Sequence, residues 1–136
     1  MLLTIERVLF LRKVEMFANI DEDALVELAS AMQEREFSAG ATIIREGDPG
    51  RELFIVVRGE VRVVKGDHEL ATLGSQGVFG ELAALDPQPR SASVVALGEC
   101  HLLQLDHAVL FEELMNNNVL ARGLIRFLVN RVRERH

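Results

Sequence analysis

The sequence predicts an α+β domain in which an antiparallel β-roll, or jelly-roll barrel, is flanked by N-terminal and C-terminal helices. Apolar residues recur at helical spacing at both ends of the 136-residue chain. Eight of the ten glycines fall between Gly40 and Gly80, where they separate short segments rich in valine, isoleucine, leucine and phenylalanine. The length fits one domain with its own core, which we expect to span residues 1–136.

The N-terminal zone, residues 1–34, is expected to be helical. Charged residues are spread through its first apolar stretch, which is typical of an amphipathic helix and unlike a secretory signal. Asp21 is a suitable N-cap for the second helix of the zone. One face of that helix collects Ala24, Leu25, Leu28, Ala29 and Met32. We expect these helices to pack on the core.

The middle zone, residues 35–106, is expected to form the β-roll. The predicted strands are 42–45, 53–58, 61–65, 70–73, 91–97 and 101–105. Glycine and aspartate in the segments 47–50 and 65–68 favour tight turns between them. Val61 and Val63 alternate with Arg62, as expected of a half-buried antiparallel strand.

The last zone, residues 107–136, is helical again by its periodicity. Its apolar stripe consists of Val119, Leu120, Gly123, Leu124, Phe127 and Leu128. Its other side carries Arg122, Arg126, Arg131, Arg133 and Arg135. This basic face is typical of a solvated helix, with binding to a partner as the alternative. The helical pattern runs to the last residue, so we expect this chain to be cut from a longer protein.

Composition excludes several classes of protein. The net charge of −6 argues against general affinity for nucleic acid, because phosphate contacts supply most of that binding. No apolar run is long enough to span a membrane. Cys100 is the only cysteine, which suits a reducing, cytoplasmic location. An acidic protein that binds an anion must concentrate positive charge at one place.

Residues 78–94 have the composition of such a place. Gly80 precedes Glu81-Leu82-Ala83-Ala84, which can form one helical turn whose first amides point outward. Two prolines then favour an extended loop that ends at Arg90. An arginine brought to those amides can hold a phosphate with paired N–H donors, and Ser91 can add a hydroxyl.

Glu81 would repel a phosphate, so its presence needs another explanation. A carboxylate beside the site can accept hydrogen bonds from a sugar hydroxyl and can also steady Arg90. The pair therefore predicts a ligand that has both a hydroxyl and a phosphate group.

The motifs Phe79-Gly80-Glu81-Leu82-Ala83 and Arg90-Ser91-Ala92-Ser93-Val94, ten residues apart from Gly80 to Arg90, resemble the phosphate-binding cassette of the cyclic nucleotide-binding domain family. Gly47-Asp48 and the segment 53–61 resemble early barrel strands of that family. The family includes regulatory subunits of cAMP-dependent protein kinase, the catabolite activator protein and cyclic nucleotide-gated channels. The resemblance covers about residues 14–134.

The resemblance implies a role for each matching position. Arg90 and Ser91 would bind the cyclic phosphate, Glu81 would bind the ribose 2′-hydroxyl, and Gly80 would permit the close turn. Backbone amides near Leu82, Ala83 and Ala92 would complete the cradle. The positions that match pocket-lining residues are Val63, Leu70, Ala71 and Val78, for which plain core packing is the alternative.

The resemblance also implies an allosteric mechanism. A C-terminal lid helix would cover the base, with Phe127 as the one aromatic candidate in the last helix, and would transmit binding to an effector domain or partner protein. The resemblance favours cAMP, because family members that prefer cGMP often have threonine where this chain has Ser91, and cGMP stays open as an alternative ligand. A ligand-free dimerisation or docking module of the same fold is a second alternative, and a homodimer is compatible with either.

We expect no enzyme and no metal. The four histidines, His68, His101, His107 and His136, show no ligand spacing, and Cys100 is expected to be a small buried residue of a strand. No residues follow the last helix to build a helix-turn-helix, so we expect no direct nucleic-acid binding by this chain.

Overall fold

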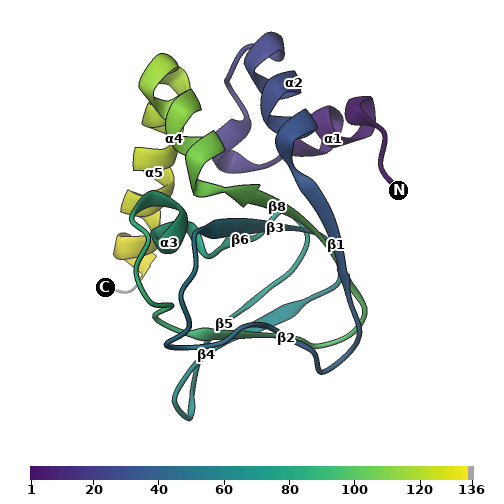
Figure 1. Cartoon of the computed structure of the whole chain (residues 1–136), viewed down its shortest axis with the longest axis vertical. Coiled ribbons are helices and arrows are strands. Elements are labelled where there is room, and N and C mark those ends of the chain that lie inside the picture. Colours follow the sequence, from purple (N-terminus) through teal and green to yellow (C-terminus); the bar gives the residue numbers. More distant parts are fainter. Residues whose placement is uncertain (135–136) are drawn as a thin grey trace. The chain divides into compact units, whose positions relative to one another are not determined.

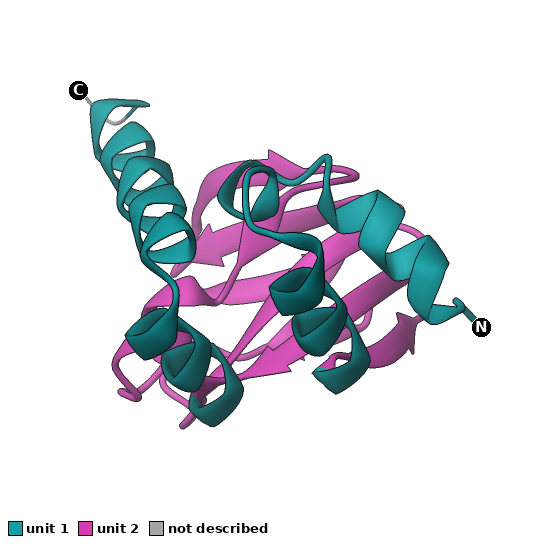
Figure 2. Cartoon of the chain, turned by 90° about the horizontal axis from the view of Figure 1, so that it is seen from above, with its two compact units in different colours: residues 1–31, 108–136 teal, residues 32–107 magenta. Residues whose placement is uncertain are grey.

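The computed structural model describes residues 1–134, so the predictions for Arg135 and His136 lie outside the described residues. The chain divides into two compact units, one of residues 32–107 and one of residues 1–31 and 108–136 (Figure 2).

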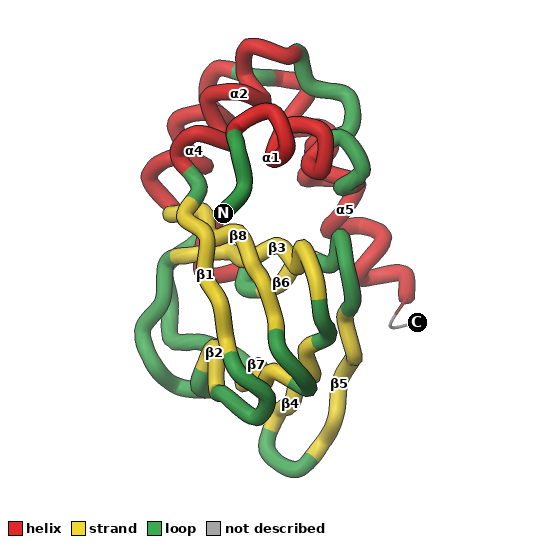
Figure 3. The backbone as a smooth tube through the Cα atoms, turned by 90° about the vertical axis from the view of Figure 1, so that its right-hand side faces the viewer, coloured by secondary structure: helices red, strands yellow, loops and turns green. Residues whose placement is uncertain are grey.

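The unit of residues 32–107 is built from two antiparallel four-stranded sheets (Figures 1 and 3). The first has the order β1 (Gln33–Phe37), β8 (Cys100–Asp106), β3 (Glu52–Arg58) and β6 (Val78–Phe79). The second has the order β2 (Thr42–Ile44), β7 (Ser93–Ala96), β4 (Val61–Lys65) and β5 (His68–Leu73). The predicted α+β β-roll is confirmed.

The core of this unit lies between the two sheets. Because side chains alternate along a strand, each sheet turns one set of apolar residues inward. The buried cluster comprises Ile44, Phe54, Val56, Val61, Phe79, Val94, Ala96, Cys100 and Leu102. Phe54 and Phe79 stack with ring centroids 5.2 Å apart. This stack fixes β6 against β3, and β6 leads directly into the turn at Gly80.

The other unit is helical. It contains α1 (Thr4–Leu11), a 3₁₀ turn η1 (Glu15–Phe17), α2 (Glu22–Ala31), α4 (His107–Asn116), whose first residue belongs to the strand unit, and α5 (Asn118–Glu134). The predicted N-cap is confirmed, because the Ala24 amide donates to Oδ2 of Asp21 over 3.2 Å. Gly123 of α5 lies against η1, where an added Cβ would come within 2.7 Å of the Met16 carbonyl oxygen.

Two strands, β1 and β6, were not predicted from the sequence. β1 begins at Gln33, inside the zone predicted to be helical, because its backbone pairs with β8 from Gln33 to Phe37. Its polar residues favour a helix, but this edge strand tolerates them since it has one neighbour. β6 has two residues, too few to show a period. β7 begins at Ser93 and not at residue 91, which leaves Arg90 and Ser91 in the preceding loop.

Candidate functional site: a buried guanidinium at the turn before α3

The turn at Gly80 joins β6 to α3 (Glu81–Leu85). Gly80 has φ +79° and ψ 8°, a left-handed conformation that favours glycine. A Cβ atom there would lie 2.8 Å from the Glu52 carbonyl oxygen and 3.0 Å from a terminal nitrogen of Arg90. Conformation and space therefore both require glycine, and the chain passes close to the Arg90 side chain.

Arg90 brings its guanidinium to this turn, as the sequence predicts. Its Nη1 donates to the carbonyl oxygens of Glu52 and Gly80, over 2.9 and 3.3 Å. Its Nη2 donates to Oε1 of Glu52 over 3.2 Å, and only 8% of the side chain is exposed. The head of Arg90 is thus fixed by three oxygen acceptors in a largely buried place.

The backbone of Arg90 is fixed as well. Its amide donates to the Asp48 carbonyl oxygen and its own carbonyl oxygen accepts from the Gly47 amide, both over 2.8 Å. Three residues further along the chain, the Ser93 hydroxyl accepts from the Glu46 amide over 2.9 Å. The segment 46–48 therefore anchors the end of the proline-containing loop from which Arg90 extends.

Burial and neighbouring carboxylates act in opposite directions on Arg90. Desolvation lowers the pKa of its guanidinium, whereas the charges of Glu52 and Glu81 raise it. An arginine stays protonated under such shifts because its ordinary pKa is far above neutrality. The site therefore holds one permanent cation facing two carboxylates.

Glu52, at the start of β3, is the site residue that the sequence reasoning missed. Its carbonyl oxygen and its carboxylate both accept from Arg90. The position of Glu52 depends on strand register. β3 pairs antiparallel with β6, with Phe54 opposite Phe79, and this pairing brings Glu52 to the turn at Gly80. Without the two-residue strand β6, nothing in the sequence places Glu52 beside Arg90.

The predicted site residues occupy three different environments. Glu81 and Ala83, in α3, are buried, while Leu82 of the same helix is 58% exposed. Ser91 is exposed and Ala92 is half-buried, in the loop directly after Arg90. The structure thus brings Gly80, Glu81 and Arg90 together, and the roles of the neighbouring residues stay predictions.

The predicted lining residues are divided between the core and the surface. Val78 is buried in β6, and Val63 of β4 packs partly against the core. Ala71 lies opposite Val63 in the sheet and is exposed, and its neighbour Leu70 is 52% exposed. Val63 and Ala71 therefore share one face of the second sheet.

Two bonds tie the first residue of α4 to elements that flank the turn. The His107 amide donates to the Arg51 carbonyl oxygen over 2.8 Å. The Nδ1 atom of its imidazole bonds to the Ala84 carbonyl oxygen of α3, so it carries the proton in that bond. His107, predicted only as a histidine without a metal-ligand pattern, joins α3 and the residue before β3 to the start of α4.

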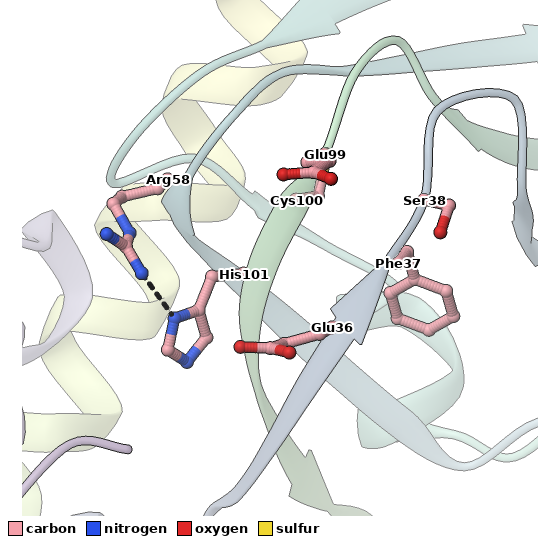
Figure 4. A pocket seen from close by; sticks show the side chains of 7 residues that line it. All are labelled: Glu36, Phe37, Ser38, Arg58, Glu99, Cys100 and His101. Atoms are coloured by element: carbon pink, nitrogen blue, oxygen red, sulfur yellow. Dashed lines mark hydrogen bonds between the residues drawn. The ribbon is translucent and has the colours of Figure 1, made fainter.

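A cavity lies elsewhere on the strand unit and contains none of the predicted site residues (Figure 4). It has a volume of about 600 Å³ and is lined by Glu36, Phe37, Ser38, Arg58, Glu99, Cys100 and His101. Within it Arg58 donates to Nδ1 of His101 over 3.2 Å. Nε2 of His101 lies 2.9 Å from Oε2 of Glu34, a β1 residue outside the lining of the cavity. This histidine is held by its neighbours, and Cys100 is buried in β8 as predicted.

Two further features of the structure bear on other classes of function. Among residues 1–134, no helix combines the length and the apolar character needed to cross a membrane. In the same described part of the chain, no three His, Cys, Asp or Glu side chains are grouped so that they could hold a metal ion.

The sequence of this chain is similar to sequences of known proteins. The model of the cyclic nucleotide-binding domain matches residues 34–118, more than half of the chain. A cAMP-dependent protein kinase regulatory subunit of Dictyostelium discoideum is 38% identical over 105 residues, which cover 71% of this chain and 32% of that protein. The chain thus spans about a third of the length of this relative.

Solved structures agree. The regulatory domain of PKA from Toxoplasma gondii, crystallised with cAMP, superposes with a TM-score of 0.75 at 33% identity and covers 80% of this chain and 43% of that chain. The regulatory subunit of a cAMP-independent protein kinase A from Trypanosoma brucei gives a TM-score of 0.79 at 26% identity, over 91% of this chain and 48% of that chain. With the β-roll, the glycine turn and the buried arginine, these matches make the chain a member of the cyclic nucleotide-binding domain family.

Proposed function

We propose that this domain is a cyclic nucleotide sensor whose ligand is cAMP. The observation that carries the proposal is the buried Arg90 guanidinium, which three oxygen acceptors hold at the turn before α3. A guanidinium is suited to paired hydrogen bonds with phosphate oxygens. The Dictyostelium and Toxoplasma relatives, named for cAMP dependence and for bound cAMP, support the choice of ligand.

The residues around Arg90 receive distinct roles. Glu81, buried at the start of α3, accepts a hydrogen bond from the ribose 2′-hydroxyl. Ser91, exposed beside Arg90, donates its hydroxyl to the phosphate, and amides near Leu82, Ala83 and Ala92 add further donors. Val63 and Ala71 line the base, together with Leu70 and Val78.

The domain acts by binding and performs no catalysis. Ligand contacts at α3 shift a pre-existing equilibrium of the C-terminal helices, and an effector outside this chain reads that shift. Residues 1–136 fold as one domain of a cytoplasmic regulator, which binds no nucleic acid through this chain. A ligand that stabilises one arrangement of α3 also favours one arrangement of His107, through the bond to Ala84.

Calorimetric titration of cAMP and cGMP into the wild-type domain and into Arg90→Ala tests the assignment. Loss of a buried, hydrogen-bonded charge partner costs ~2–5 kcal/mol, so the variant should bind about 30-fold to several thousand-fold more weakly. Arg58→Ala is the matched control, because Arg58 contacts His101 in the separate cavity. Equal affinity of wild type and Arg90→Ala for cAMP would remove the proposed role of Arg90.

A second candidate is a domain of this fold that responds to no cAMP. The Trypanosoma relative supports this candidate, because it is the regulatory subunit of a kinase described as cAMP-independent. The same titration separates the two functions, because a folded wild-type domain that takes up neither cAMP nor cGMP at millimolar concentration supports the second.

A further inference from the structure

The charge around Arg90 is unbalanced before any ligand arrives. Oε1 of Glu52 accepts from Arg90 and also from the Arg51 amide, over 3.2 and 3.0 Å, so this carboxylate is held in place. Glu81 is buried nearby, and its charge acts on the same guanidinium. Arg90 therefore faces two carboxylates before any ligand arrives.

This balance affects phosphodiesters and phosphomonoesters differently. A cyclic phosphodiester has one negative charge, whereas a phosphomonoester has about 1.5 to 2 negative charges at pH 7. Arg90 is the cation that the structure fixes at this turn, where its guanidinium already donates to the Gly80 carbonyl oxygen and to the Glu52 carboxylate. The additional charge of a monoester meets the repulsion of both carboxylates, of which Glu81 is buried and Glu52 has 30% of its side chain exposed.

We propose that Glu52 is a specificity-determining residue, whose fixed carboxylate makes the Arg90 site accept a singly charged phosphodiester and reject phosphomonoesters. The inference rests on the proposed function and assigns a role to a side chain that it leaves without one. Glu52 is a better residue to test than Glu81. Because Glu81 is proposed to bind the ribose, its replacement would remove a ligand contact as well as a charge.

The test compares two acyclic ligands that differ in charge. Adenosine 5′-monophosphate and its phosphate methyl ester share base, sugar and chain, but the ester is a monoanionic diester. Each is measured by displacement of a fluorescent cAMP analogue from the wild-type domain and from Glu52→Gln. The amide has nearly the size of the carboxylate and keeps an oxygen that accepts from Arg90 and from the Arg51 amide.

The wild-type domain should bind the methyl ester more tightly than the monophosphate. In Glu52→Gln the ratio of the two dissociation constants should fall by roughly tenfold, since one repulsive charge is gone. A displaced Arg90 would weaken both ligands together, so the ratio isolates the charge effect. Glu99→Gln alters the net charge equally, at an exposed residue of the separate cavity, and should leave the ratio at its wild-type value.

Three results would overturn the inference: an unchanged ratio in Glu52→Gln, equal wild-type affinities for monoester and diester, or failure of both acyclic ligands to displace the analogue. The last would mean that selection lies in the shape of the cyclic phosphate. Failure of the proposed function would give another result, because the wild-type domain would then bind neither the fluorescent analogue nor cAMP.

Discussion

The Cβ atom that Gly50 lacks would lie 2.0 Å from Nε of Arg90 and 2.4 Å from its Cζ. The guanidinium therefore packs directly on the backbone of Gly50. Every side chain at position 50 would compete with Arg90 for the same space, so Gly50 is part of the surface that holds the cation at the turn.

Gly50→Ala should displace the guanidinium and weaken cAMP binding by about tenfold or more, because the hydrogen bonds of Arg90 depend on its position. Calorimetry measures the affinity, and thermal unfolding verifies the fold. Gly98→Ala is the control: an added Cβ there meets nothing within 4 Å, and its φ is outside the left-handed region. Wild-type affinity in Gly50→Ala would show that Arg90 can bind from another position.

Replacement of His107 should uncouple α4 from α3 without removing the ligand site. In His107→Ala the side-chain bond to the Ala84 carbonyl oxygen is lost, while the amide bond to the Arg51 carbonyl oxygen remains available. We expect cAMP affinity within a few-fold of wild type. Hydrogen exchange of residues 108–134, which should change on cAMP binding in wild type, should respond much less in the variant. An undiminished response would place the coupling elsewhere.

Glu113 of α4 should make stability depend on pH. Burial first, then a hydrogen bond that protonated Glu113 donates to Glu27 and repulsion by Glu27, Glu112 and Asp21, raise the pKa of Glu113 to about 7. Its folded pKa is above the unfolded value of 4.5, so its contribution to stability is fully present below pH 4.5 and is lost as pH rises through 7.

Glu113→Gln should therefore raise the unfolding temperature at pH 8 and have little effect at pH 4. Chemical or thermal unfolding at both pH values measures the difference. Glu60→Gln, at an exposed residue of the strand unit, controls for the change in net charge. A gain of the same size at both pH values would contradict the raised pKa.

Gly123→Ala should destabilise the helical unit although alanine favours a helix. The intrinsic gain is about 0.8–1.0 kcal/mol. The new Cβ would lie 2.7 Å from the Met16 carbonyl oxygen, a backbone contact, and overpacking of this kind costs about 1–3 kcal/mol. The clash should win by up to about 2 kcal/mol, seen as a lower denaturation midpoint. An increased midpoint would mean that η1 can shift to accommodate the added methyl group at little cost in stability.

The sequence predicts those features that depend on residues close together in the chain. Asp21 as N-cap, the β-roll and the approach of Arg90 to Gly80 follow from periodicity, turn residues and spacing, and the structure has all three. β1 was hidden because sheet pairing overrode the helical preference of its residues. Glu52 was hidden because its place depends on strand register, a long-range property that one sequence does not display.

The double bridge between the Arg90 backbone and the segment 47–48 makes substitutions at this position unusually easy to interpret. Because both backbone groups are already satisfied by Gly47 and Asp48, exchange of the side chain should leave the main-chain trace intact. Lysine, glutamine and alanine at position 90 would then form a graded series, in which charge and forked geometry are removed one at a time from a fixed scaffold.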